Sequence, residues 1–197
     1  MKRVLLFLPL LVLALAAVAG QASQTTGASA AVGTFKVKAG AGETGYSVND
    51  FLPSEVTIDK GSTIQWTFPW YEVHFVAMFQ GAEPQGEPAV SPQPVSFPNS
   101  SNYVYSGDIF GNPQTPPTFS VTFPTEGDYT YFCGIHPNMT AKVHVKASGG
   151  QDQAAIDAAG TAELNTRLAE AKAAATTANK PATTTQLANG TTKYSLV

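Results

Sequence analysis

The sequence has a single cysteine, Cys133, so no disulfide can form within the chain. Charged residues are also scarce, at 13% of the total, and acidic residues outnumber basic ones by 14 to 11. Nucleic-acid binding depends on a clustered basic surface, so this balance argues against a nucleic-acid partner. No Ser/His/Asp or paired-carboxylate arrangement can be recognised in the sequence, and we predict that the protein is not an enzyme.

A long membrane-spanning run is missing as well. Residues 4–18 are apolar but fall short of the roughly 20 residues that a spanning helix needs. They follow two basic residues and precede small ones, as in a secretory signal peptide. We therefore predict a signal peptide over residues 1–22, cleaved near Ala19 or Ala22, and a periplasmic or extracytoplasmic location. The alternative is that the leader is retained as an anchor, and peripheral membrane association is compatible with either.

Removing the leader takes away two basic residues and leaves 9 basic against 14 acidic ones, a net charge of −5. Exported proteins commonly use their cysteines in pairs, as disulfides. An unpaired thiol in an oxidising compartment is a liability unless something occupies it. The single cysteine of this chain therefore needs a partner other than a second cysteine.

The rest of the chain divides into three parts. Residues 23–33 are rich in Ser, Gln, Thr, Gly and Ala and indicate a flexible arm. Residues 34–147 contain short runs in which apolar and polar residues alternate, as expected of strands buried on one face. The fold class predicted is therefore all-β, a Greek-key β-sandwich. The proline-rich stretch 80–117 is expected to cross the sandwich, with an edge strand near residues 103–105.

Residues 148–197 form a tail of different composition. The segment 152–179 is rich in alanine, with a few apolar residues at helical spacing, and predicts a helix that would be marginal alone. Residues 180–197 are rich in Thr, Asn and Gly and predict disorder. We interpret the tail as a solvated spacer. The alternative is a segment that docks on a partner.

Three candidate metal ligands lie within seven residues, in the run Cys133-Gly-Ile-His136-Pro-Asn-Met139. Thiolate and thioether are soft ligands and imidazole suits copper, so the set favours a copper site with two His, one Cys and a weak axial Met. The second histidine must come from elsewhere. His74 is the candidate, because the alternation around His144 places that residue on the solvent face of its strand.

At these residues the chain resembles the cupredoxin family of the plastocyanin, amicyanin and auracyanin type. The resemblance covers about residues 34–147, includes the aromatic-rich strand before the cysteine, and is most similar to amicyanin in its ligand spacing. It implies one type 1 copper ion, with His74, Cys133 and His136 in a trigonal plane and Met139 as the axial ligand. It also implies that His136 carries the electron to the surface. Phe75 departs from the pattern, since many members have Asn there.

The resemblance implies an exported single-electron carrier whose mononuclear copper cycles between Cu(I) and Cu(II). Its partners would be redox proteins, and we expect a monomer. Multicopper enzymes need many more histidines and a further domain, which the chain does not supply. The alternative is a copper-handling protein that stores or delivers the metal with the same ligands.

Overall fold

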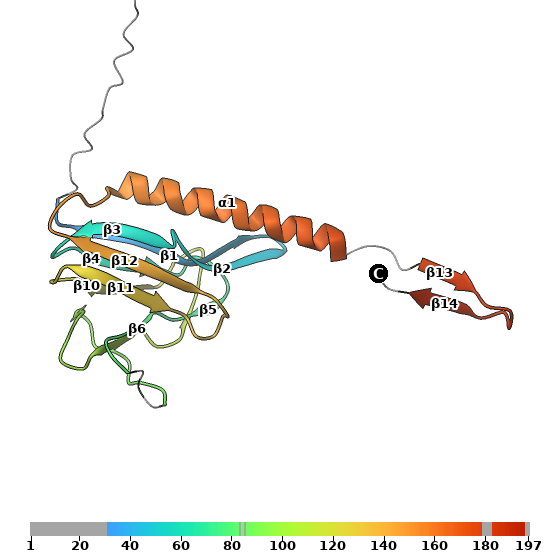
Figure 1. Cartoon of the computed structure of the whole chain (residues 1–197), viewed down its shortest axis with the longest axis horizontal. Coiled ribbons are helices and arrows are strands. Elements are labelled where there is room, and N and C mark those ends of the chain that lie inside the picture. The colour runs from blue at the N-terminus through green and yellow to red at the C-terminus, as the bar shows by residue number, and fades with distance from the viewer. Residues whose placement is uncertain (1–30, 83, 85, 179–182, 196–197) are drawn as a thin grey trace, which may run out of the picture.

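Two five-stranded β-sheets pack face to face in the computed structural model, which describes residues 31–82, 84, 86–178 and 183–195 (Figure 1). The predicted signal peptide and most of the predicted flexible arm lie outside these residues. The two sheets confirm the predicted all-β sandwich, and a helix follows them near the C-terminus. No helix among the described residues is long and apolar enough to cross a membrane.

The first sheet has the strand order β2-β1-β4-β10-β7. Its strands are β1 (Thr34–Glu43), β2 (Tyr46–Leu52), β4 (Thr63–Thr67), β7 (Val95–Ser96) and β10 (Thr118–Thr122). Strand β1 pairs antiparallel with β2 and parallel with β4. This parallel pairing requires the chain to leave the sheet between β2 and β4, and it does so to begin the second sheet.

The second sheet has the order β3-β12-β11-β6-β8. Its strands are β3 (Glu55–Asp59), β6 (Ala77–Phe79), β8 (Tyr103–Tyr105), β11 (Gly127–Phe132) and β12 (Thr140–Lys146). The edge strand predicted near residues 103–105 is confirmed as β8. Strands β5 (Val73–His74) and β9 (Ile109–Phe110) form a separate two-stranded pair.

Alternating burial explains why these segments form strands. In β4 and β12 every second residue is buried, so that one face of each strand meets the core while the other remains at least partly accessible. Between the sheets, the ring of Tyr131 packs edge-on against Trp66 and Phe51, with centroid separations of 5.0 and 4.6 Å. Large buried aromatic rings of this kind give the sandwich a stiff centre.

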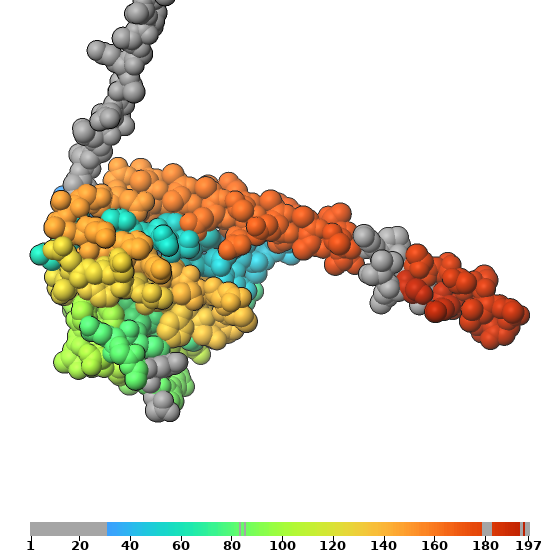
Figure 2. All heavy atoms as spheres, in the orientation of Figure 1, coloured from blue at the N-terminus to red at the C-terminus, as the bar shows by residue number. Residues whose placement is uncertain are grey.

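The Ala-rich segment of the tail is helical, as predicted, but it is no solvated spacer. Helix α1 (Gln153–Ala178) lies along the sandwich over β1 and β2 (Figures 1 and 2). Ile156 is fully buried in the main core, and Leu164 and Leu168 pack against a smaller cluster of Ala41, Val48 and Leu52. The spacer interpretation is therefore wrong for this segment, because the sandwich supplies the apolar surface that the helix lacks.

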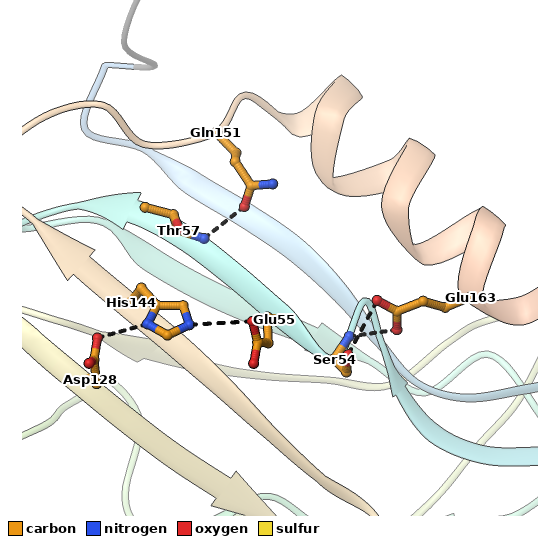
Figure 3. A network of polar contacts seen from close by, with 7 residues as sticks. All are labelled: Ser54, Glu55, Thr57, Asp128, His144, Gln151 and Glu163. Carbon is orange, nitrogen blue, oxygen red and sulfur yellow. Dashed lines mark hydrogen bonds and ion pairs between the residues drawn. The ribbon is translucent and has the colours of Figure 1, made fainter.

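Polar contacts fix the position of the helix and of the residues before it (Figure 3). The Ser54 N–H and hydroxyl donate to the two carboxylate oxygens of Glu163, at 2.8 and 3.2 Å. The Thr57 N–H donates to the Gln151 side-chain oxygen at 2.7 Å. At the helix start, the Asp152 carboxylate accepts from the Ala155 N–H at 2.8 Å, a standard N-cap. The helix and the residues before it are thereby attached to edge strand β3 and to the turn that precedes it.

The end of the tail also differs from the sequence prediction. Disorder is expected over residues 180–197, yet β13 (Thr183–Gln186) and β14 (Thr192–Ser195) form an antiparallel hairpin. Its turn contains Asn189 and Gly190, and Gly190 has a φ of +80°. Asn-Gly is a strong hairpin signal because both residues tolerate positive φ. The Asn-Gly pair is present in the sequence. Its preference for a hairpin outweighs the disorder that the polar composition predicts.

Candidate metal centre

Strand β5 brings His74 to one end of the sandwich. It is only two residues long and is held by antiparallel pairing with β9, in which His74 lies opposite Ile109. The imidazole is completely buried. Because strand β5 is so short, the orientation of the His74 ring depends mainly on the residues packed around it and less on the strand.

The other three candidate ligands come from the loop between β11 and β12, which folds back on itself. The Cys133 N–H donates to the Met139 carbonyl at 2.9 Å, and the Met139 N–H donates to the His136 carbonyl at 3.3 Å. Asn138 adopts a φ of +68°, a left-handed conformation that Asn tolerates better than most residues. These backbone bonds close the loop, from which the side chains of Cys133 and His136 approach His74.

His74, Cys133 and His136 converge, with one ligand atom of each lying within 4.8 Å of the other two. The Cys133 Sγ is 4.0 Å from His74 Nδ1 and 3.8 Å from His136 Nδ1. Two metal bonds of about 2.0 and 2.3 Å, the lengths typical for imidazole and thiolate, separate N and S by about 3.8 Å at a trigonal angle. The three residues therefore fit one metal ion, and their chemistry suits copper.

Met139 is also buried, at 1% exposure, and belongs to the same core cluster as Cys133. Its carbonyl accepts the Cys133 N–H, so the two residues adjoin at the closure of the loop. In contrast, His136 is only partly buried, and the neighbouring Ile135 is 44% exposed. Of the two candidate histidines, His136 is the one that reaches the protein surface.

Burial and the nearby His136 lower the pKa of His74 from 6.5 to about 4. Removing an imidazolium from water is costly, and a second imidazole beside it adds repulsion when both are charged. His74 is therefore neutral above about pH 4, which is the form that binds a metal ion.

This shift predicts how the metal-free protein responds to acid. Between pH 6.5 and 4 the unfolded chain protonates His74 while the folded chain does not. Burying neutral His74 therefore contributes fully to the stability of the folded chain above pH 6.5. This contribution is lost as the pH falls from 6.5 to 4. The full shift corresponds to about 3 kcal/mol in the free energy of unfolding. Urea denaturation at several pH values in this window should show the decline.

The comparison for that experiment is His74→Leu, which fills the same buried position without a titrating group. Its unfolding free energy should fall by about 3 kcal/mol less across the same pH window. An equal decline in both proteins would contradict the assignment to His74.

The sequence did not reveal a contact that Phe75 makes through its backbone. The Phe75 N–H lies 3.4 Å from the Cys133 Sγ and donates to it. Its ring packs edge-on against Tyr105, with centroids 5.2 Å apart. This residue thus joins the His74 segment to the cysteine loop through its backbone. Every residue except proline carries a backbone N–H, so the sequence could not single this one out.

His144 is remote from this cluster, in line with its predicted place on the outer side of its strand. Its Nδ1 is 2.7 Å from Asp128 Oδ1 and its Nε2 is 3.7 Å from Glu55 Oε2 (Figure 3). The hydrogen bond from His144 lowers the pKa of Asp128. His144 bridges three neighbouring strands on the surface of the second sheet, which is a structural role.

Comparison with known proteins identifies one family. Residues 35–146 match the family described as copper binding proteins, plastocyanin/azurin family. The matched stretch contains all four candidate ligands and ends before helix α1. No curated protein matches the chain by sequence.

Solved structures similar to this chain include several copper proteins. Amicyanin from Paracoccus versutus is 23% identical, with 57% of this chain and 81% of that one covered and a TM-score of 0.39. A purple cupredoxin from Nitrosopumilus maritimus is 19% identical, with 57% and 99% covered and a TM-score of 0.38. A pseudoazurin from Sinorhizobium is 17% identical, with 58% and 75% covered and a TM-score of 0.38.

Proposed function

Because the chain belongs to the plastocyanin/azurin family of copper binding proteins, we propose that it is an exported single-electron carrier with one type 1 copper ion. The observation that carries the proposal is the convergence of His74, Cys133 and His136 on a common centre. Bound copper would supply a one-electron couple between Cu(I) and Cu(II).

In this proposal His74, Cys133 and His136 would hold the copper ion, and Met139 would complete the ligand set as a weaker, soft donor. The role of the protein is to keep these side chains in place in both oxidation states. The closed loop, the Phe75 N–H on the cysteine sulfur and the close-packed core all restrict movement. Little rearrangement then accompanies electron transfer. His136, partly exposed, is the proposed route for the electron to and from partner proteins.

Burial of the ligands favours an electron carrier over the copper-handling alternative. His74 and Cys133 are 0% and 2% exposed. A delivery protein must present its ligands to an acceptor, whereas an electron carrier must retain its metal through many cycles. The family generally consists of electron carriers rather than enzymes, which supports the same choice.

The test is to load the mature protein with copper and cycle it repeatedly with a mild reductant and oxidant. An electron carrier should return to the same absorption each time, with one copper per chain by elemental analysis. It should also keep its copper when mixed with a metal-free copper protein. Transfer of the metal to that acceptor, faster in the Cu(I) state, would favour copper handling instead.

The axial role of Met139 can be tested by replacing it with leucine. A Met→Leu exchange in a core conserves volume and usually costs less than about 1.5 kcal/mol, so the variant should fold. Losing a weak donor that favours Cu(II) should raise the midpoint potential while the blue colour persists.

The chain provides a matched control in Met78, which is also fully buried but lies in β6. Met78→Leu should leave the midpoint potential unchanged. If both variants shift the potential equally, Met139 is a core residue and not a ligand.

A further inference from the structure

Gly40 of strand β1 lies against the imidazole of His74. A side chain at this position would begin with a Cβ 2.8 Å from His74 Cδ2 and 3.2 Å from Cε1, with Nε2 nearer still. Real Cβ atoms essentially never come within 3.0 Å of another heavy atom. The backbone of β1 therefore occupies the space directly beside the edge of the ring that faces away from Cys133.

The local backbone conformation is also specific to glycine. Gly40 has a φ of +75°, and the register between β1 and β2 shifts between Ala39 and Ala41. A positive φ is strained for any residue with a side chain. An irregularity of this kind lets one strand approach a neighbouring group more closely than a regular strand would.

The His74 ring lacks the usual hydrogen bond that fixes the orientation of a metal-binding histidine. Such a ring normally donates its second N–H to an acceptor. Here Nε2 is buried and has no hydrogen-bond partner among the described residues. Strand β5, which carries His74, is only two residues long. Packing must therefore hold the ring, and Gly40 provides the nearest backbone.

We propose that Gly40 is a positioning residue for the copper site, whose bare backbone sets the direction in which His74 presents Nδ1 to Cys133. The proposal rests on the proposed copper-binding function. Helix α1 supports the same strand from outside, because Leu164 and Leu168 pack on the cluster that contains Ala41. The C-terminal helix, which lies beyond the family match, thereby braces the His74 side of the site.

Two neighbouring glycines provide matched controls for Gly40→Ala. At Gly42, on the same strand, a Cβ would come 2.5 Å from Trp70 Nε1, with the Tyr46 carbonyl oxygen nearer still, so Gly42→Ala causes comparable crowding away from His74. At Gly45, φ is +88° and nothing lies within 4 Å of an added Cβ. Gly45→Ala therefore reports the cost of positive φ alone.

Copper loading is the first measurement. Gly40→Ala should reduce Cu(II) affinity about 10- to 100-fold, as loss of a supporting contact to a ligand typically does. It should also change the hyperfine splitting in the EPR spectrum. Gly42→Ala and Gly45→Ala should lower the melting temperature but keep the wild-type spectrum. A wild-type spectrum and affinity in Gly40→Ala, or equal changes in Gly42→Ala, would overturn the proposal.

A double-mutant cycle on the metal-free protein tests the contact without relying on copper. Gly40→Ala should lower the melting temperature much less in a His74→Ala background, since the ring it displaces is gone. If Gly40→Ala alone fails to fold but the double variant with His74→Ala folds, that result would also support the contact between Gly40 and His74. An equal loss in both backgrounds, or failure of both to fold, would show that His74 is not what Gly40 accommodates. This measurement uses no copper, so its result would hold even if the chain proved unable to bind copper.

Discussion

Replacing Cys133 with serine is expected to abolish the intense blue absorption that the wild-type protein should develop with Cu(II). That band requires a thiolate bound to the metal, and Cys133 is the single cysteine of the chain. A serine hydroxyl is a hard ligand that remains protonated at neutral pH, so it cannot replace a thiolate. The variant should give a pale, ordinary Cu(II) spectrum with broad EPR hyperfine splitting, or bind no copper.

The fold should survive this change, so that the loss can be attributed to the site. Serine is close to cysteine in size, and the Phe75 N–H that donates to the sulfur can donate to an oxygen instead. His144→Ala is the control, because it removes a histidine that takes no part in the cluster. That variant should remain blue. A blue Cys133→Ser protein would mean that the ligands do not converge as proposed, and the electron-carrier function would have to be abandoned.

Replacing Ile156 with aspartate should detach helix α1 from the sandwich. Ile156 is completely buried in the main core, and truncating such a side chain alone costs about 2–5 kcal/mol. A carboxylate without a partner at this position adds a further penalty for burying a charge. An isolated Ala-rich helix is marginal in water, so the detached segment should also lose helix. Hydrogen exchange should show residues 153–178 becoming unprotected, and the melting temperature should fall.

Ala154→Asp is the matched control, since it places the same carboxylate in the same turn at an exposed position. Its effect on stability should be within about 0.5 kcal/mol, as for most surface substitutions. If Ile156→Asp leaves hydrogen exchange of the helix unchanged, the helix is held by its polar contacts, such as Ser54 to Glu163, and not by burial. If the helix does detach, the absorption spectrum of the copper-loaded Ile156→Asp variant is a further test of the bracing role of α1.

Much of the fold could be predicted because its signals are local. Residues such as Ile64 and Trp66 alternate with polar neighbours, and this period of two gives both the strand and its buried face. The cysteine loop was equally readable, since the ligand types of Cys133, His136 and Met139 and their spacing lie within one short run. His74 followed from the need for a second imidazole and the lack of another candidate on a core-facing position.

The sequence by itself thus determined the sandwich and pointed to His74, Cys133 and His136, which the fold brings together, and it predicts Met139 as a further ligand. Three features were decided only by the tertiary structure: the docking of α1, the Phe75 N–H on the sulfur and the approach of Gly40 to His74. Each depends on segments far apart in the chain that meet only after the sheets have packed. An Ala-rich helix carries little apolar pattern of its own, and a glycine or a backbone N–H has no side chain to mark its role. Their physical effect comes entirely from what lies next to them in the folded protein.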